Sequence, residues 1–148
     1  MMTAPVQTKR GGRLPSLEAQ TVAFFENARR FGGNASYSLR WHGFQAYLRY
    51  QPRFELPDGK TAGEILVIAS ITVPEAYRRR GWFWRYCQLC AALARDGIAI
   101  ESVNNSRLAA ALRRRPEFWE FEPRQFLMKK AGPEDWPLVL PPDPKMVF

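Results

Sequence analysis

Residues 64–73 read Glu-Ile-Leu-Val-Ile-Ala-Ser-Ile-Thr-Val, and this apolar run constrains the fold more than any other part of the chain. A strand with one face in water alternates apolar and polar residues, whereas a strand covered on both faces is apolar throughout. Pro74 ends the run, because proline cannot donate a ladder hydrogen bond. We therefore predict a central strand over residues 64–73 with both faces covered.

The segment after this strand predicts a βαβ unit. A helix is expected over residues 81–96, because apolar and polar residues there fall on opposite stripes at helical spacing, the apolar stripe being Phe83, Cys87, Cys90 and Ala94. Gly97 would stop this helix, and residues 98–100 would form a second buried strand. Two buried strands joined by a helix are parallel, so the fold class is α/β.

Two further helices are predicted on either side of this unit. Ser16 opens the first and Gly32 stops it, with an apolar face made of Leu17, Phe24, Ala28 and Phe31. The other is capped by Asn105 or Ser106, continues through residues 107–115 and is closed by Pro116. The basic residues 113–115 would complement the negative end of its dipole.

Aromatic and β-branched residues indicate the remaining strands. One covers residues 44–55, where Pro52 marks an edge or a bulge, and Asp58-Gly59 indicates the hairpin that follows. A last single strand is expected over residues 121–130, with Pro123 placing part of it at a sheet edge.

The length of 148 residues fits one compact domain, which we place at residues 16–130. Residues 1–15 contain three basic residues and almost no large apolar one, so we expect a disordered basic arm. Residues 131–148 hold five of the twelve prolines and form an extended Pro-rich tail. We find no leader and no run of ~18 apolar residues, so we expect a cytoplasmic protein that does not contact a membrane.

Cys87 and Cys90 form the chain's one C-x-x-C pair. A redox pair needs its reactive thiol at a helix N-terminus, but these cysteines lie inside an apolar helical stretch. A zinc site would need two more ligands, and His42 is the only histidine. We therefore predict two buried thiols and no metal site.

The net charge of +8 implies an anionic partner, and Arg78, Arg79 and Arg80 indicate where it binds. They lie immediately before a predicted helix, whose N-terminus is already positive and normally attracts acidic residues. Three cations there repel one another unless an anion completes the site. Gly81 lets the backbone of the turn approach such an anion closely. We predict a phosphate-binding turn.

This turn resembles the coenzyme A loop of the GNAT superfamily of N-acetyltransferases, which follows a central strand and reads Arg/Gln-x-x-Gly-x-Gly/Ala. The match is Arg78-x-x-Gly81-x-Phe83, where Phe83 replaces a small residue. Residues 101–118 also resemble the family's asparagine-bearing turn and small-residue helix, with Glu117 in place of a glycine. The resemblance covers residues 64–130, and the chain is most similar to short stand-alone members from bacteriophages and bacteria.

The resemblance implies a GNAT-like fold, with a mixed central sheet, helices on both of its faces and a βαβ cofactor-binding core. It implies acetyl-CoA as the acyl donor and direct attack by a primary amine. The cofactor would be held by the strand edge, the turn and the asparagine, that is by Ile71, Thr72, Val73, Arg78, Arg79, Arg80, Gly81, Trp82, Phe83 and Asn105.

Two carboxylates are candidates for the base that takes the amine proton. Glu101 lies at the mouth of the second buried strand and is preferred over Glu64, which opens the first. Many family members release the thiolate with a tyrosine, and Leu112 occupies that position here. Tyr86 or water would have to replace it, or efficient catalysis has been lost.

Two other functions remain open at this stage. The chain could be a GNAT-fold binding module without turnover, because of Phe83 and Leu112. It could also bind nucleic acid, because residues 78–85 interleave four arginines with Trp82, Phe83 and Trp84. The acceptor could be a small molecule, a protein or a modified nucleic acid, with the overall basic charge mildly favouring an anionic one. A homodimer is compatible with all of these readings.

Overall fold

The structure is a computed structural model that describes residues 15–130. The predicted basic arm and Pro-rich tail lie almost wholly outside this range. The described elements follow one another in the order α1 (Leu17–Phe31), β1 (Ala35–Trp41), β2 (Phe44–Glu55), β3 (Thr61–Thr72), the 3₁₀ turn η1 (Glu75–Tyr77), α2 (Trp82–Leu93), β4 (Gly97–Ile100), α3 (Ser106–Arg113), β5 (Trp119–Glu122) and β6 (Gln125–Lys129).

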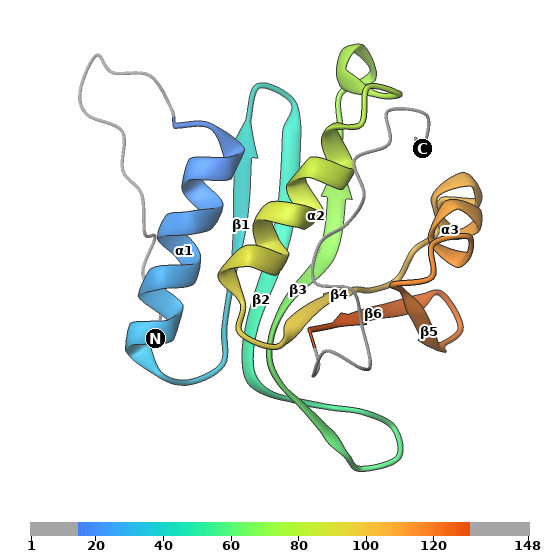
Figure 1. Cartoon of the computed structure of the whole chain (residues 1–148). Coiled ribbons are helices and arrows are strands. Elements are labelled where there is room, and N and C mark those ends of the chain that lie inside the picture. The colour runs from blue at the N-terminus through green and yellow to red at the C-terminus, as the bar shows by residue number, and fades with distance from the viewer. Residues whose placement is uncertain (1–14, 131–148) are drawn as a thin grey trace.

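The six described strands form one mixed sheet in the order β1-β2-β3-β4-β6-β5 (Figure 1). Strands β3 and β4 are parallel and are joined by α2, whereas the other four neighbouring pairs are antiparallel. Side chains from Ile65 to Ile68 are completely buried. The predicted α/β class, the buried central strand and the parallel pair are therefore confirmed.

The two faces of the sheet are covered differently. On one face Leu66, Ile98 and Met128 lie side by side in register and join a large cluster with the buried residues of α1, α2 and α3. On the other face a smaller cluster consists of strand residues alone, namely Phe54, Ala62, Ile65, Val67, Ala99 and Leu127. The expected helices on both faces are not found within residues 15–130, because all three helices share one face.

Helix α1 begins and ends where the sequence predicts. The Ser16 hydroxyl accepts a hydrogen bond of 3.1 Å from the Ala19 N–H, and Gly32 ends the helix in the left-handed conformation with φ of 94°. Phe31 was expected on the buried face but is 54% exposed, because it occupies the last helical position beyond the sheet. No helix within the described residues is both long enough and apolar enough to cross a membrane.

The last predicted strand is instead a hairpin. Residues 121–130 do not form one strand, because β5 and β6 pair antiparallel across a turn at Pro123-Arg124. Arg124 has a φ of 61°, which allows the reversal, and its guanidinium donates a hydrogen bond of 2.8 Å to the Val103 carbonyl. This turn escapes prediction because arginine rarely takes the left-handed conformation.

Gly97 begins β4 rather than stopping α2, which ends at Leu93 with Ala94 as its C-cap. Its φ of 144° is a conformation that favours glycine, and a Cβ atom there would overlap the backbone carbonyl oxygen of Met128 on β6. The glycine therefore allows β6 to lie directly against the start of the parallel strand.

Candidate functional site

Strands β3 and β4 separate at a defined point and leave a slot between them. Their pairing ends at Ile68 and Ile100, where the Glu101 N–H donates a hydrogen bond of 3.1 Å to the Ile68 carbonyl. At the same level β3 has an extra residue, Ala69, in its pairing with β2. Such a bulge bends and twists the strand. Ser102, with φ of 53°, turns the backbone that follows β4 away from β3. Within residues 15–130, the β4 side of Ser70–Thr72 is thus left without a strand neighbour.

Three cavities lie at or beside this slot. A central cavity of about 240 Å³ lies between the two strand ends. It shares Ile71 and Asn105 with a loop cavity of about 470 Å³, and Glu101 with a trough of about 830 Å³. The shared residues make the central cavity a neighbour of the other two.

The backbone of the Arg-rich turn is arranged in the way that anion-binding turns require. Arg79 and Gly81 both have left-handed conformations, with φ of 61° and 77°. Turns of this kind direct successive N–H groups to one side. Moreover, α2 begins at Gly81 without a side-chain cap, whereas Ser16 caps α1 and Asn105 caps α3. Gly81, the cap residue of α2, has no side chain that could accept from the first N–H groups of this helix.

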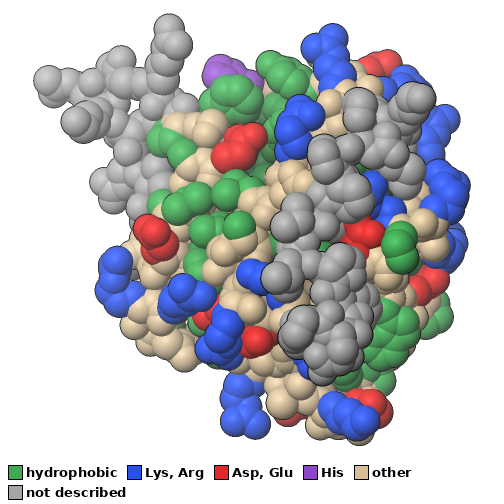
Figure 2. Space-filling view, viewed as in Figure 1, with side chains coloured by type: hydrophobic (Ala, Val, Ile, Leu, Met, Phe, Trp, Pro, Cys, Tyr) green, Lys and Arg blue, Asp and Glu red, His purple; other side chains and the backbone are tan. Residues whose placement is uncertain are grey.

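The loop cavity is positively charged. Its charged lining residues are Arg78, Arg79 and Arg107 against a single carboxylate, Glu75. Figure 2 shows blue side chains gathered at the upper right edge, which in the view of Figure 1 lies over the turn after β3 and over α3. Arg107 was not predicted, since two arginines 28 residues apart face one cavity only once the chain is folded.

The structure brings six of the ten predicted cofactor residues to the loop cavity, namely Ile71, Thr72, Val73, Arg78, Arg79 and Asn105. Arg78 also holds the turn in place, because its Nε donates a hydrogen bond of 2.8 Å to the Val73 carbonyl. The Asn105 side chain accepts a hydrogen bond of 2.9 Å from the Leu108 N–H, which confirms the predicted helix cap. Arg80 is exposed and does not line this cavity.

Trp82 and Phe83 can contribute to this cavity only through their backbones. The Trp82 ring stacks on Tyr86 at 4.9 Å and donates a hydrogen bond of 3.0 Å to Glu18. Phe83 is 3% exposed and Trp84 is 2% exposed. The Phe83 side chain thus lies in the helix-covered core and not in the cavity.

Glu101 lies where the central cavity opens into the trough, and it is held there by Arg49. The guanidinium of Arg49 donates hydrogen bonds of 2.6 and 3.0 Å to the two carboxylate oxygens. Both side chains are partly exposed, at 30% for Arg49 and 17% for Glu101. Arg49 lies on β2, opposite Val67 of β3, so the pair crosses the face of the central strand. Sequence reasoning missed Arg49, because its partner is 52 residues away.

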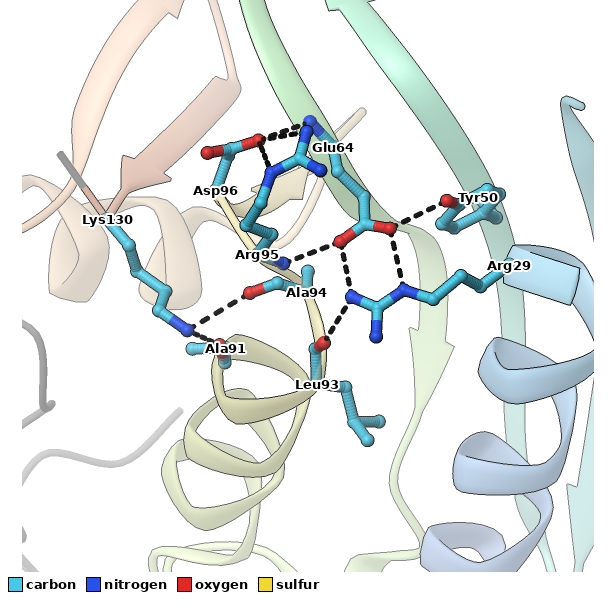
Figure 3. Close-up of polar contacts among 9 residues, drawn as sticks. All are labelled: Arg29, Tyr50, Glu64, Ala91, Leu93, Ala94, Arg95, Asp96 and Lys130. Atoms are coloured by element: carbon cyan, nitrogen blue, oxygen red, sulfur yellow. Dashed lines mark hydrogen bonds and ion pairs between the residues drawn. The ribbon is translucent and has the colours of Figure 1, made fainter. Parts of the chain in front are cut away.

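Glu64 is not part of this group, although it was proposed beside Glu101. It lies near the start of β3, where Arg29 binds both of its carboxylate oxygens and Tyr50 donates a further hydrogen bond (Figure 3). Burial alone would raise the pKa of Glu64, but hydrogen bonds from Arg29, Tyr50 and the Arg95 N–H lower it to about 2. A carboxylate so firmly held as the anion is a poor proton acceptor and links helices to the sheet instead.

Leu112, predicted to stand where many family members have a thiolate-releasing tyrosine, and its predicted substitute Tyr86 are also buried. Leu112 is completely buried, and Tyr86 is 1% exposed with its hydroxyl 2.7 Å from that of Thr21. Burial raises the pKa of Tyr86 well above 10.0. Tyr86 is therefore sealed in the core and does not line the three cavities. Glu117, which replaces the family's glycine, is buried and pairs with Arg115 at 2.9 Å.

Cys87 and Cys90 are completely buried free thiols, as predicted. Within residues 15–130 no group of three or more His, Cys, Asp or Glu side chains could hold a metal ion. Burial raises the pKa of both thiols, that of Cys90 to about 12. We expect neither to react with Ellman's reagent at pH 8 until denaturant is added, when two thiols per chain should appear. Rapid reaction of the native protein would contradict this burial.

The chain was compared with protein-family models, with curated proteins and with solved structures. None of these comparisons found a match.

Proposed function

We propose that this protein is an N-acetyltransferase of the GNAT type, which transfers an acetyl group from acetyl-CoA to a primary amine. One observation carries the proposal: two parallel strands part immediately before an Arg-rich turn that opens an uncapped helix. The resemblance in residues 78–83 would require a slot for the pantetheine arm and an anion site for the diphosphate at this place. The central cavity between the strand ends and the arginine-lined loop cavity beside it support the proposal.

The residues present fit coenzyme A in charge and in hydrogen bonding. Arg79 and Arg107 would contact its phosphate groups from two walls of the loop cavity, together with the N–H groups of the turn. The edge of Ser70–Thr72 that lacks a strand neighbour would pair with the amide groups of the pantetheine arm, much as an added strand pairs with a sheet edge. The thioester would then lie in the central cavity, near Glu101.

Acetyl-CoA would supply the thioester, and the protein would supply position and a proton acceptor. The neutral amine nitrogen forms a bond to the carbonyl carbon, and the bond from that carbon to sulfur breaks. Glu101 takes the proton that the nitrogen loses, and the thiolate takes a proton from water. A positioned base of this kind typically increases the rate by about 10²–10⁴-fold.

A binding module without turnover is the second candidate, and the absence of an available hydroxyl at Leu112 and Tyr86 favours it. The nucleic-acid hypothesis loses its main support, because Phe83 and Trp84 are buried and the Trp82 ring is stacked on Tyr86. Of the residues that prompted it, the exposed arginines remain to bind phosphate groups.

Calorimetric titration with acetyl-CoA, followed by thiol release in the presence of a panel of amines, tests the proposal. We expect one-site binding and a thiol signal that depends on the amine. Binding without thiol release would favour the binding module. Failure of acetyl-CoA to bind the folded protein would refute the proposed function.

A Glu101→Gln variant separates catalysis from binding. We expect its kcat to fall by about 10²–10⁴-fold. Its affinity for acetyl-CoA should stay within twofold of the native value, since Glu101 would adjoin only the thioester and does not line the loop cavity that would hold the phosphate groups. Steady-state kinetics and calorimetry on the same preparation measure both quantities. If the kcat of the variant equals that of the native protein at every pH between 6 and 9, Glu101 is not the base.

A further inference from the structure

The trough beyond Glu101 has a different character from the loop cavity. It lies on the helix-free face, since Arg49, Val67 and Ala99 follow one another in register across β2, β3 and β4. Its volume of about 830 Å³ exceeds the need of a simple alkylamine and lies in the range of pockets for drug-sized molecules. Its charged lining residues are Arg49, Arg53, Glu55, Glu101 and Glu122.

These charges do not suit an acceptor of one sign. Among the described residues three carboxylates and two guanidinium groups line the trough, so this lining does not share the positive charge of the whole chain. An acidic peptide or a nucleic acid would meet the carboxylates, and a polyamine would meet Arg49 and Arg53. The anionic acceptor favoured by the overall charge is therefore not supported by the lining of this trough. An acceptor that carries both signs fits the lining.

The Arg49–Glu101 pair offers both signs at the mouth of the slot. Two N–H groups of Arg49 donate hydrogen bonds of 2.6 and 3.0 Å to the two carboxylate oxygens of Glu101. The same pair of donors could bind a substrate carboxylate that takes the place of Glu101. In an α-amino acid the amine and the carboxylate share one carbon atom. A substrate carboxylate on Arg49 would hold the amine beside Glu101 and free the Glu101 oxygens to accept its proton.

One part of the trough, at Phe54, Leu56 and Phe121, is suited to an apolar side chain. Phe54 and Phe121 meet edge to face, with ring centroids 5.9 Å apart, and Leu56 lies next to them in the same lining. Phe54 is 4% exposed, whereas Phe121 and Leu56 are only half-buried and leave apolar surface for a ligand.

We propose that the trough is the acceptor site and that it takes a free amino acid with an apolar or aromatic side chain. The carboxylate would bind Arg49, the amine would face Glu101, and the side chain would lie against Phe121 and Leu56. This inference rests on the proposed function, because it assigns the amine of that same reaction.

Phenylalanine and phenylalanine amide, offered to the native protein with acetyl-CoA, test the inference. We expect kcat/KM for the free acid to exceed that for the amide at least tenfold, with putrescine and an acidic peptide both below the acid. Amidation lowers the pKa of the amine and so increases its reactive neutral form. A preference for the acid would therefore report recognition of the carboxylate.

The Arg49→Gln variant should lose this preference, so that acid and amide differ less than twofold, while its affinity for acetyl-CoA stays unchanged. Arg40→Gln removes an equal charge from an exposed position on β1 outside the three cavities, and it should keep the preference. Calorimetric titration of acid and amide, with and without coenzyme A, gives the same comparison without turnover. Equal binding of acid and amide would overturn this inference alone, whereas lack of coenzyme A binding would overturn the proposed function.

Discussion

A Gly81→Glu variant is expected to fold and to bind acetyl-CoA at least about 100-fold more weakly than the native protein. Gly81 begins α2, and its side-chain position adjoins the N–H groups that would hold the diphosphate. Two unit charges 4 Å apart near a protein surface repel by about 4 kcal/mol, which exceeds the roughly 2.7 kcal/mol that a 100-fold loss requires. The φ of 77° adds about 1–2 kcal/mol of backbone strain. Gly81 is also buried, so circular dichroism must first show that the variant is folded. Calorimetric titration measures the loss.

Gly59→Glu is the matched control for this substitution. Gly59 also has a left-handed conformation, with φ of 88°, and a Cβ atom there would meet nothing within 4 Å. It lies in the turn between β2 and β3, outside the three cavities. This variant should bind acetyl-CoA normally. Native affinity in a folded Gly81→Glu protein would exclude the Arg-rich turn as the diphosphate site.

Glu64→Gln should be strongly destabilising, although it leaves the apolar core intact. It keeps the size of the side chain but removes the charge that Arg29 on α1, Tyr50 on β2 and the Arg95 N–H after α2 all stabilise (Figure 3). The gap between an ordinary pKa of 4.5 and about 2 corresponds to about 3 kcal/mol at neutral pH. Urea denaturation at pH 7 should show a loss of this size.

The same pair of proteins should differ in their response to acid. Because folding lowers the pKa of Glu64, its contribution is complete above about pH 4.5 and is lost as the pH falls towards 2. The stability advantage of the native protein over Glu64→Gln should therefore shrink steadily between pH 5 and pH 2. A difference that stays constant over this range would show that the ion pair is not its source.

Glu120→Gln provides the comparison for exposed pairs. Hydrogen bonds from Arg113 and the Arg124 N–H hold the pKa of Glu120 at about 2 as well, but this pair lies at the surface. Exposed pairs contribute little to stability because solvent screens them. We expect a change several times smaller than that of Glu64→Gln in the same urea experiment.

Features set by neighbouring residues could be predicted from the sequence. The caps Ser16 and Asn105 accept hydrogen bonds from N–H groups three residues away. The buried strand could be predicted because its own residues are apolar throughout. Two hairpin turns escaped prediction because residues with weak turn preference take the left-handed conformation there, His42 with φ of 45° and Arg124 with φ of 61°. Their geometry is imposed by the pairing of the strands around them.

The candidate site divides in the same way. The turn at residues 78–81 is contiguous, so its arginines and glycine could be found in the sequence. Arg49 and Arg107 lie on β2 and α3 and reach the slot only after folding. Glu64 and Glu101 look alike in sequence, as carboxylates at strand ends. What distinguishes them is Arg29, which lies 35 residues before Glu64 and binds it next to the core.

Because α1, α2 and α3 share one face of the sheet, the side chains that keep the protein folded are largely separate from those that line the trough. The last residues of β2 that line the trough are only partly covered, namely Gln51, Arg53 and Glu55. Exposed positions of this kind tolerate substitution with little loss of stability. A lineage with this architecture could therefore change its acceptor by mutations in one hairpin, while the donor site on α2 and α3 stays as it was.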